Sequence, residues 1–345
     1  MNITKKLVDT LTYSAGNDVQ VDLPTDGLIT RIELELYSTL SGAGAAALSV
    51  MGLWRLVQNL KIEGGGGKSY FGMTGTQMGM LLHYLNLKDH PGTTWREIVA
   101  TSQYQAWRLH FGSRPRDIWG RDNPFDLTAA IPAVDETNLK LTWTCVASDD
   151  SVDDTLTVSS GTMRVTIYEV LPPGRGAYPP AWPRMIPVSS SESYDPGATK
   201  SDLSGERDVP TGSYVRRIAI MALDATAGSS NGPLLKDDQM TEVGLKLVKE
   251  NRRLVEIRAK QLELQNPLLD GMQVVDTPNT LSPHNPTGGL YCLDLRQYDH
   301  PDYGLDTTRM TTGDVKLGMT IGAYASAEKE HIWYDQVQPY RGRGG

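Results

Sequence analysis

Alternation of apolar and polar residues is the most regular pattern in this chain, and it is clearest over residues 27–38. Ile32, Leu34 and Leu36 fall on one side of an extended segment there. The residues on its other side are Arg31, Glu33, Glu35 and Tyr37. A period of two residues is typical of a β-strand with one buried face. We therefore expect a strand whose charged side faces solvent or a neighbouring subunit.

Similar alternation predicts further strands, bounded by turn-forming residues. They cover 7–14, 19–23, 56–63, 68–73, 139–147 and 161–170 in the first half, and 245–248 and 253–258 in the second. Four consecutive glycines at 64–67 suit a hairpin turn, because glycine takes positive φ without steric cost. Helical spacing over 76–87 and 93–108 predicts two short helices inserted between strands.

The second half of the chain repeats the strand pattern of the first. The stretch LPTDGLITRIEL at 23–34 returns as VPTGSYVRRIAI at 209–220, so that Arg31 is matched by Arg217 and Ile32 by Ile218. Four weaker pairs follow in the same order, namely 59–63 with 244–248, 108–111 with 292–295, 138–144 with 314–320, and 164–169 with 330–335. Five blocks in one order indicate a tandem duplication of a β-domain.

A proline-rich stretch separates the two copies. Seven prolines lie between residues 171 and 197. Proline cannot donate a backbone hydrogen bond, so this density favours a stiff, extended connection over a ladder strand or a helix. We expect an N-terminal jelly-roll domain at 1–171, a linker at 172–196, and a C-terminal jelly-roll domain with a short tail at 197–345.

Composition limits the class of protein. The 345 residues include 34 Gly and 20 Pro, which suits a turn-rich β-protein. A formal net charge of −8 argues against a nucleic-acid-coating surface, so we expect no direct sequence-specific nucleic-acid partner. We also expect no transmembrane helix and no signal peptide, because the necessary apolar runs are missing. Cys145 and Cys292 lie in apolar, strand-like runs, which favours buried free thiols.

Several stretches resemble chemical sites without meeting their requirements. The run GGGGKS at 64–69 is similar to a phosphate-binding loop, but Ile62 stands where that motif needs its first glycine. Glu33 and Glu35 form a carboxylate pair such as glycosidases use, although their place on a strand favours a surface role. The acidic loop at 149–154 lacks the spaced ligands of a calcium site, and the histidines lack zinc-site spacing. We expect no enzyme activity, no cofactor and no metal.

Antiparallel strands in even succession, with long loops and few helices, fit an all-β fold of two tandem eight-stranded jelly rolls with short helical insertions. Viral capsids, lectins and cupins use the jelly roll, and the metal-binding histidines of cupins are missing here. With its duplication, its proline-rich joint and the two strands LPTDGLITRIEL and VPTGSYVRRIAI, the chain resembles the double jelly-roll major capsid proteins of tailless icosahedral viruses. This lineage includes tectiviruses, corticoviruses and, more remotely, adenovirus.

The resemblance implies a capsid protein of the virion, made in the host cytoplasm, whose trimers form pseudo-hexameric capsomers of an icosahedral shell. The implied partners are other copies of the chain, minor capsid and vertex proteins, and an internal membrane. Aromatic residues and Arg are favoured in interfaces, so the candidate subunit-contact residues are Trp95, Tyr104, Trp107, Arg108 and Trp119. The candidate residues for the inner, membrane-proximal side are Lys5, Lys6, Arg341 and Arg343.

Other interpretations stay open at this point. The tryptophans could simply cover the base of the first jelly roll. A carbohydrate-binding or carbohydrate-active β-sandwich could use surface tryptophans to stack on sugar rings, and would be a monomer with a groove. A trimeric phage fibre or adhesin is a third possibility, although such proteins usually have shorter repeats.

Overall fold

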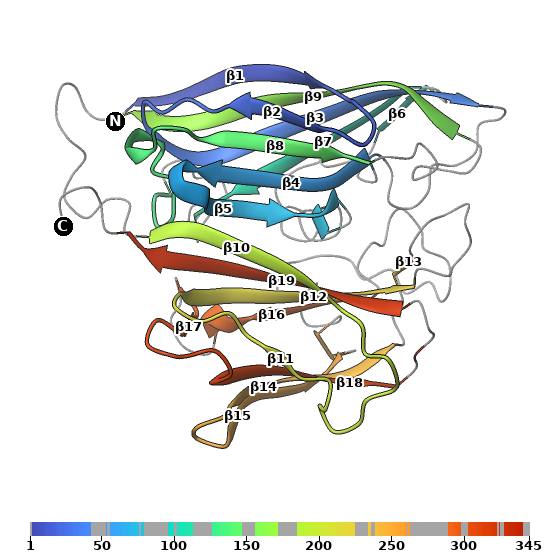
Figure 1. The fold of residues 1–345 in the computed structure, drawn as a ribbon, viewed down its shortest axis with the longest axis vertical. Coiled ribbons are helices and arrows are strands. Elements are labelled where there is room, and N and C mark those ends of the chain that lie inside the picture. The colour runs from blue at the N-terminus through green and yellow to red at the C-terminus, as the bar shows by residue number, and fades with distance from the viewer. Residues whose placement is uncertain are drawn as a thin grey trace. The chain divides into compact units, whose positions relative to one another are not determined.

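In the computed structural model of the protein, the described secondary structure consists almost entirely of β-strands (Figure 1). It describes residues 2–42, 53, 56–75, 77–78, 96–99, 102–112, 126–146, 156–171, 185–224, 234–235, 239–259, 261–262, 289–297, 303–322, 324 and 328–340. The chain divides into two compact units, one formed by 1–190 with 337–345 and the other by 191–336.

The first sheet of the first unit has the strand order β1-β9-β3-β7-β6. These strands are β1 (Asn2–Thr12), β9 (Leu156–Leu171), β3 (Leu28–Gly42), β7 (Ser102–His110) and β6 (Arg96–Val99). All neighbours in the sheet are antiparallel. Ile32, Leu34 and Leu36 of the central strand β3 are fully buried. The alternation predicted at 27–38 is thus confirmed.

The second sheet of the first unit has the order β2-β8-β4-β5. Its strands are β2 (Asp18–Asp22), β8 (Lys140–Cys145), β4 (Val57–Gly64) and β5 (Lys68–Met73), and a short 3-10 turn, η2 (Gly65–Gly67), joins the last two. Gly66 and Gly67 have positive φ values of 73° and 77°. The hairpin expected at the glycine run is therefore present. A second 3-10 turn, η3, covers Ala133–Asp135.

The second unit contains a second pair of sheets. In one, β10 (Met185–Tyr194), β19 (Glu328–Pro339) and β12 (Tyr214–Asp224) are neighbours, and β12 also pairs with β13 (Leu234–Leu235), β16 (Leu290–Asp294) and β17 (Leu305–Asp306). The other has the order β11 (Arg207–Asp208), β18 (Val315–Ile321), β14 (Met240–Leu247) and β15 (Arg252–Arg258). The 3-10 turn η5 (Leu295–Gln297) follows β16. Apolar side chains from both sheets form one buried cluster.

The two halves share one topology. The order β1-β9-β3-β7 corresponds to β10-β19-β12-β16, and the order β2-β8-β4-β5 corresponds to β11-β18-β14-β15. Two four-stranded sheets with these crossovers make an eight-stranded jelly roll, so each half contains one. The five repeated sequence blocks lie on matching strands, β3 with β12, β4 with β14, β7 with β16, β8 with β18, and β9 with β19. The predicted tandem duplication is confirmed.

The helix predicted over 93–108 was wrong, because β6 and β7 occupy this stretch. Gln105, Trp107 and Leu109 are buried, and the residues between them are less so. This alternation belongs to a strand paired with β3, and that pairing outweighs the helical spacing. Of the helix predicted over 76–87, Gln77 and Met78 are helical and the remainder lies outside the described residues.

The expectation that the proline-rich stretch excludes a ladder strand was also wrong. Strand β10 covers Met185–Tyr194, within the predicted linker, and it is an edge strand. Most of the prolines precede it, and Pro187 is the one that falls inside it. An edge strand tolerates proline, because one row of its backbone groups needs no partner. The predicted domain limits at 171 and 197 remain a prediction.

Candidate subunit-contact surface

One side of the first jelly roll carries charged and aromatic side chains in place of apolar ones. It is the side of the β1-β9-β3-β7 sheet turned away from the buried residues of β3, and we call it the polar face. Its members are Lys5, Arg31, Glu33, Glu35, Tyr37, Tyr104, Arg108, Arg164 and Tyr168. They come from four strands, and antiparallel register brings them together: Glu33 lies opposite Arg108, and Lys5 lies opposite Tyr168.

Glu33 is the centre of this surface. Its carboxylate lies 2.8 Å from Lys5 Nζ and 2.6 Å from Arg108 Nε. It also accepts a hydrogen bond of 3.0 Å from the Tyr168 hydroxyl. The Arg31 guanidinium stacks on the Tyr168 ring, 3.5 Å from its centroid. The neighbouring strands thus cover Glu33, so that its side chain is only 12% exposed. Of the two expectations for this side of the strand, solvent or a neighbouring subunit, free exposure to solvent does not hold for Glu33, and the contact with a subunit stays a prediction.

The surroundings of Glu33 favour its charged form. Burial alone would raise the pKa of the carboxyl, but the hydrogen bond from Lys5, the charge of Arg108 and the hydrogen bond from Tyr168 together hold that pKa below its ordinary value. The same hydrogen bond raises the pKa of Lys5. A carboxyl whose pKa is lowered by folding stabilises the folded state above its unfolded pKa, and this contribution is lost as the pH falls through the folded pKa.

Replacing Glu33 by Gln should therefore reduce the stability of the folded protein at neutral pH. It should also make that stability change less as the pH is lowered. We expect a loss of roughly 1–3 kcal/mol at pH 7, because hydrogen bonds to a charged group are lost. The difference from wild type should shrink as the pH falls below about 4.3, the ordinary pKa of Glu. Urea unfolding between pH 3 and pH 7 measures both effects. Glu35→Gln is the control, since Glu35 is 32% exposed and lies 3.6 Å from Arg164, and its change should be small. Equal losses at pH 3 and pH 7 would contradict the assignment.

The structure brings three of the candidate residues together on the polar face. Arg108 and Lys5 both contact Glu33. Tyr104 donates to Glu35 at 3.5 Å, and its ring centroid lies 4.7 Å from that of Tyr37. Burial and the negative charge of Glu35 raise the pKa of Tyr104 to about 12, so its hydroxyl stays protonated at neutral pH.

The other candidates are placed differently. Trp107 points to the opposite side of β7 and is 1% exposed, so its ring offers little surface to a partner. Lys6 is exposed on β1. Trp95, Trp119, Arg341 and Arg343 lie outside the described residues.

The contributions of β9 to this face were not predicted from the sequence. Arg164, Thr166 and Tyr168 alternate with buried Val165 and Ile167, so the period-two pattern marked them as one side of a strand. Nothing local showed that this side lies against Glu33.

The glycine-rich hairpin of the first jelly roll binds a carboxylate of its own chain. Glu136 accepts hydrogen bonds from Gly65 N–H at 2.8 Å, from the Tyr70 hydroxyl at 2.5 Å and from Lys68 Nζ at 3.3 Å. Burial opposes the charge of Glu136, but these hydrogen bonds hold its pKa below the ordinary value. A Cβ atom at Gly64 would lie 2.6 Å from Glu136 Oε2, which explains a glycine there. Glu136 therefore serves as an internal carboxylate partner of this hairpin, bound by the Gly65 N–H, Lys68 and Tyr70.

Within the part of the chain that the structure describes, no group of three or more His, Cys, Asp or Glu side chains is placed to hold a metal ion. Among the same residues, no helix is long and apolar enough to cross a membrane. Cys145 and Cys292 are buried free thiols, as expected.

Comparison with known proteins identifies the fold. No protein-family model and no curated protein matches the sequence. The STIV major capsid protein, in contrast, is similar in structure, with a TM-score of 0.71 and 16% identity over 98% of this chain and 97% of that one. The major capsid protein P2 of bacteriophage PM2 has a TM-score of 0.58 at 13% identity over 100% of both chains. PBCV-1 VP54 has a TM-score of 0.61 at 12% identity over 97% and 94%. The chain therefore has the double jelly-roll fold of these viral major capsid proteins.

Proposed function

We propose that this protein is a viral major capsid protein that assembles as a trimeric, pseudo-hexameric capsomer of an icosahedral shell. The observation that carries the proposal is the likeness to the STIV major capsid protein over nearly the full length of both chains. A comparison limited to one jelly roll would fit many functions, since lectins and cupins share that fold. Two complete jelly rolls in tandem, matched over 98% of this chain and 97% of the STIV protein, favour a capsid function over those of proteins with a single jelly roll.

The duplication also supplies a geometric reason for a trimer. Each chain contributes two jelly rolls with the same strand order. Three chains related by a threefold axis place six similar bodies in a ring, which gives a nearly hexagonal outline. Such an assembly can occupy positions of local sixfold symmetry with only three copies of the chain.

The polar face is our proposed subunit contact, with Tyr104 and Arg108 as its main contributors. Tyrosine and arginine are the residue types that most often dominate protein interfaces. Both side chains are only partly buried in the single chain, so a partner can still cover them. Trp95 and Trp119 remain candidates for the same contact.

Contacts with an internal membrane and with minor capsid and vertex proteins are part of the proposal. The ammonium group of Lys5 is already paired with Glu33, so exposed Lys6 is the better lipid contact of the two. Arg341 and Arg343 are further candidates. Each basic residue near an anionic membrane contributes on the order of 1 kcal/mol, so these residues would assist binding without anchoring the chain.

The solution mass of the purified protein tests the proposal. Light scattering should give a species of three times 37.9 kDa, about 114 kDa, and negative-stain images of that species should show a hexagonal outline.

Tyr104→Ala should weaken the trimer at least tenfold, because an aromatic contact is lost. Lys61→Ala, an exposed change on β4 in the other sheet, should leave it intact. A species that remains monomeric at high concentration would contradict the capsomer and favour a carbohydrate-binding protein.

A further inference from the structure

Three cations form one row across the second jelly roll. Lys246 of β14 lies directly opposite Arg253 of β15 on one side and directly opposite Lys316 of β18 on the other. Directly opposed residues of an antiparallel sheet project from the same face and lie close together. Like charges in such positions destabilise a sheet. The row therefore lowers stability unless something negative lies beside it.

The outer two cations have acidic partners, and the central one does not. Lys316 Nζ lies 2.7 Å from Glu206, and Arg253 Nη1 lies 2.5 Å from Glu256. Within the described part of the chain, Lys246 makes no ion pair. The central cation is thus the one available to an external anion.

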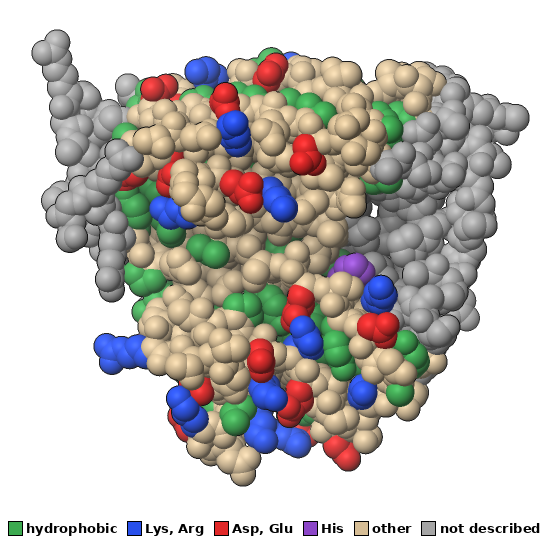
Figure 2. Space-filling model, in the orientation of Figure 1, with side chains coloured by type: hydrophobic (Ala, Val, Ile, Leu, Met, Phe, Trp, Pro, Cys, Tyr) green, Lys and Arg blue, Asp and Glu red, His purple; other side chains and the backbone are tan. Residues whose placement is uncertain are grey.

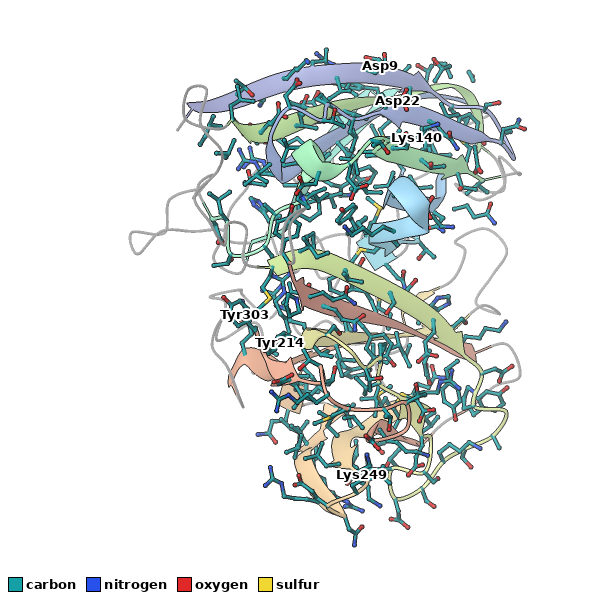
Figure 3. All side chains as sticks on the ribbon, turned by 60° about the vertical axis from the view of Figure 1, so that its left-hand side comes forward. Asp9, Asp22, Lys140, Tyr214, Lys249 and Tyr303 are labelled. Carbon is teal, nitrogen blue, oxygen red and sulfur yellow. The ribbon has the colours of Figure 1, made fainter. Side chains whose placement is uncertain are left out.

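The positions around Lys246 explain why it lacks a partner. Two residues along the strands, Gly244 and Gly318 stand opposite each other and offer no acidic side chain, and Glu256, opposite Gly244 on β15, is paired with Arg253. On the hairpin side, the Asp314 carboxylate accepts from Lys249 Nζ and from Thr311. Figure 3 labels Lys249 at the tip of the β14–β15 hairpin, and Figure 2 shows basic and acidic side chains interspersed over this region of the unit.

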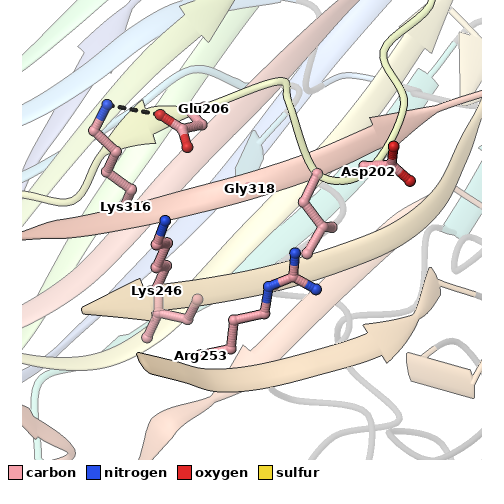
Figure 4. A pocket seen from close by; sticks show the side chains of 9 residues that line it. Asp202, Glu206, Lys246, Arg253, Lys316 and Gly318 are labelled. Carbon is pink, nitrogen blue, oxygen red and sulfur yellow. Dashed lines mark hydrogen bonds and ion pairs between the residues drawn. The ribbon is translucent and has the colours of Figure 1, made fainter. Parts of the chain in front are cut away.

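A pocket of about 130 Å³ lies beside the row, and Gly244 and Gly318 are among the residues that line it. A water molecule needs roughly 10–15 Å³ of such space, so the pocket can hold a group of several heavy atoms. Figure 4 shows Lys246, Lys316 and Arg253 along the pocket, with the carboxylate of Asp202 turned away from the two lysines. Glu206 also lines the pocket, and its carboxylate forms an ion pair with Lys316.

The segment that forms the other wall is held in a strained conformation. Asp202 and Leu203 have positive φ values of 50° and 59°, which are unfavourable for residues other than glycine. Leu203 packs on the two glycines, since a Cβ at Gly244 would lie 2.6 Å from its Cδ1. Hydrogen bonds of 3.0 and 3.1 Å between the backbones of Gly205 and Met319 fix the segment to β18. The wall is therefore a defined part of the fold.

We propose that this pocket binds a compact oxyanion, a phosphate group, with Lys246 as its main contact. Lysine and arginine donate charge-assisted hydrogen bonds to phosphate oxygens, and a doubly charged group offsets the repulsion within the row. Glu206 and Glu256 keep the outer cations in place and leave the centre of the row to the ligand. Free phosphate and the headgroup of an acidic lipid offer the same chemistry.

Thermal unfolding in sodium phosphate, compared with sodium chloride at equal ionic strength and pH, tests the site. A ligand that binds only the folded state raises the melting temperature further with each increase in its concentration, as the logarithm of that concentration once the site is mostly occupied. We expect this in wild type and in Lys249→Gln, whose exposed cation lies outside the row. Lys246→Gln should need about tenfold more phosphate for the same rise, because a charge-assisted hydrogen bond is lost. Without phosphate, Lys246→Gln should melt no lower than wild type, because it removes the repulsion between Lys246 and the cations on either side. A lower melting temperature in chloride would therefore indicate a folding defect of the variant.

Flotation with vesicles identifies the source of the phosphate group. Binding to phosphatidylcholine vesicles containing phosphatidic acid, lost in Lys246→Gln, would assign a lipid headgroup. A phosphate effect without flotation would assign free phosphate. The proposal is overturned if phosphate and chloride act alike on wild type, or if Lys246→Gln keeps the full phosphate effect. These outcomes do not depend on the trimer mass, so this site and the capsid function can fail separately.

Discussion

An Asp335→Ala variant should lose about 3–5 kcal/mol of stability, because it breaks a buried ion pair and removes the carboxylate that faces two buried arginines. Asp335 is 5% exposed. Its Oδ1 accepts from Arg216 Nε at 3.1 Å and from Nη2 at 2.6 Å, and its Oδ2 lies 3.5 Å from Arg217 Nη1. Burial already lowers the pKa of Arg217, and the charge of Arg296 adds to this effect. Without Asp335, both guanidinium groups would lose a carboxylate that stabilises their charge.

Urea unfolding at pH 7 measures this loss, and a double variant provides its control. Arg216→Met with Asp335→Leu replaces both charges by apolar side chains of comparable size. Removing both partners of a buried pair is often nearly neutral, whereas removing one is strongly destabilising. The double variant should therefore recover the part of the loss that comes from Arg216, while Arg217 keeps its ion pair with Asp294. A single variant within 1 kcal/mol of wild type would show that the pair contributes little.

A Trp143→Ala variant should lose about 3–5 kcal/mol, because it leaves a large cavity in the first jelly roll. Trp143 of β8 is fully buried. Its indole nitrogen donates to the Leu56 carbonyl at 3.2 Å, and its ring centroid lies 6.0 Å from that of Tyr13. The change therefore removes packing and leaves a buried carbonyl without this donor.

Trp143→Phe separates the two contributions. It keeps one aromatic ring in the core and removes the hydrogen bond with only part of the ring volume, so the expected loss is smaller, about 1–3 kcal/mol. Denaturant unfolding followed by circular dichroism compares the three proteins. If both variants lost the same amount, the hydrogen bond and not the cavity would account for the stability.

Much of the strand arrangement could be predicted from local pattern. Residues 68–73 were predicted as a strand and form β5, Lys68–Met73. The repeat was readable because equivalent strands retain similar side chains, and Arg31 and Arg217 occupy matching places on β3 and β12. The candidate site was only partly predictable. Arg108 was chosen for its residue type, but its contact with Glu33 depends on the pairing of β3 with β7.

By itself, the sequence determined the all-β class, the tandem duplication and the inward side of the strand at 27–38, because these depend on the order of neighbouring residues. Tertiary structure decided which side chains meet. Glu33 became buried because strands distant in sequence bring Lys5 and Arg108 over it. Likewise, Lys246 faces Arg253 and Lys316 only through the register of three strands. Pairing between strands is set by the packing of the whole fold, so no local pattern contains it.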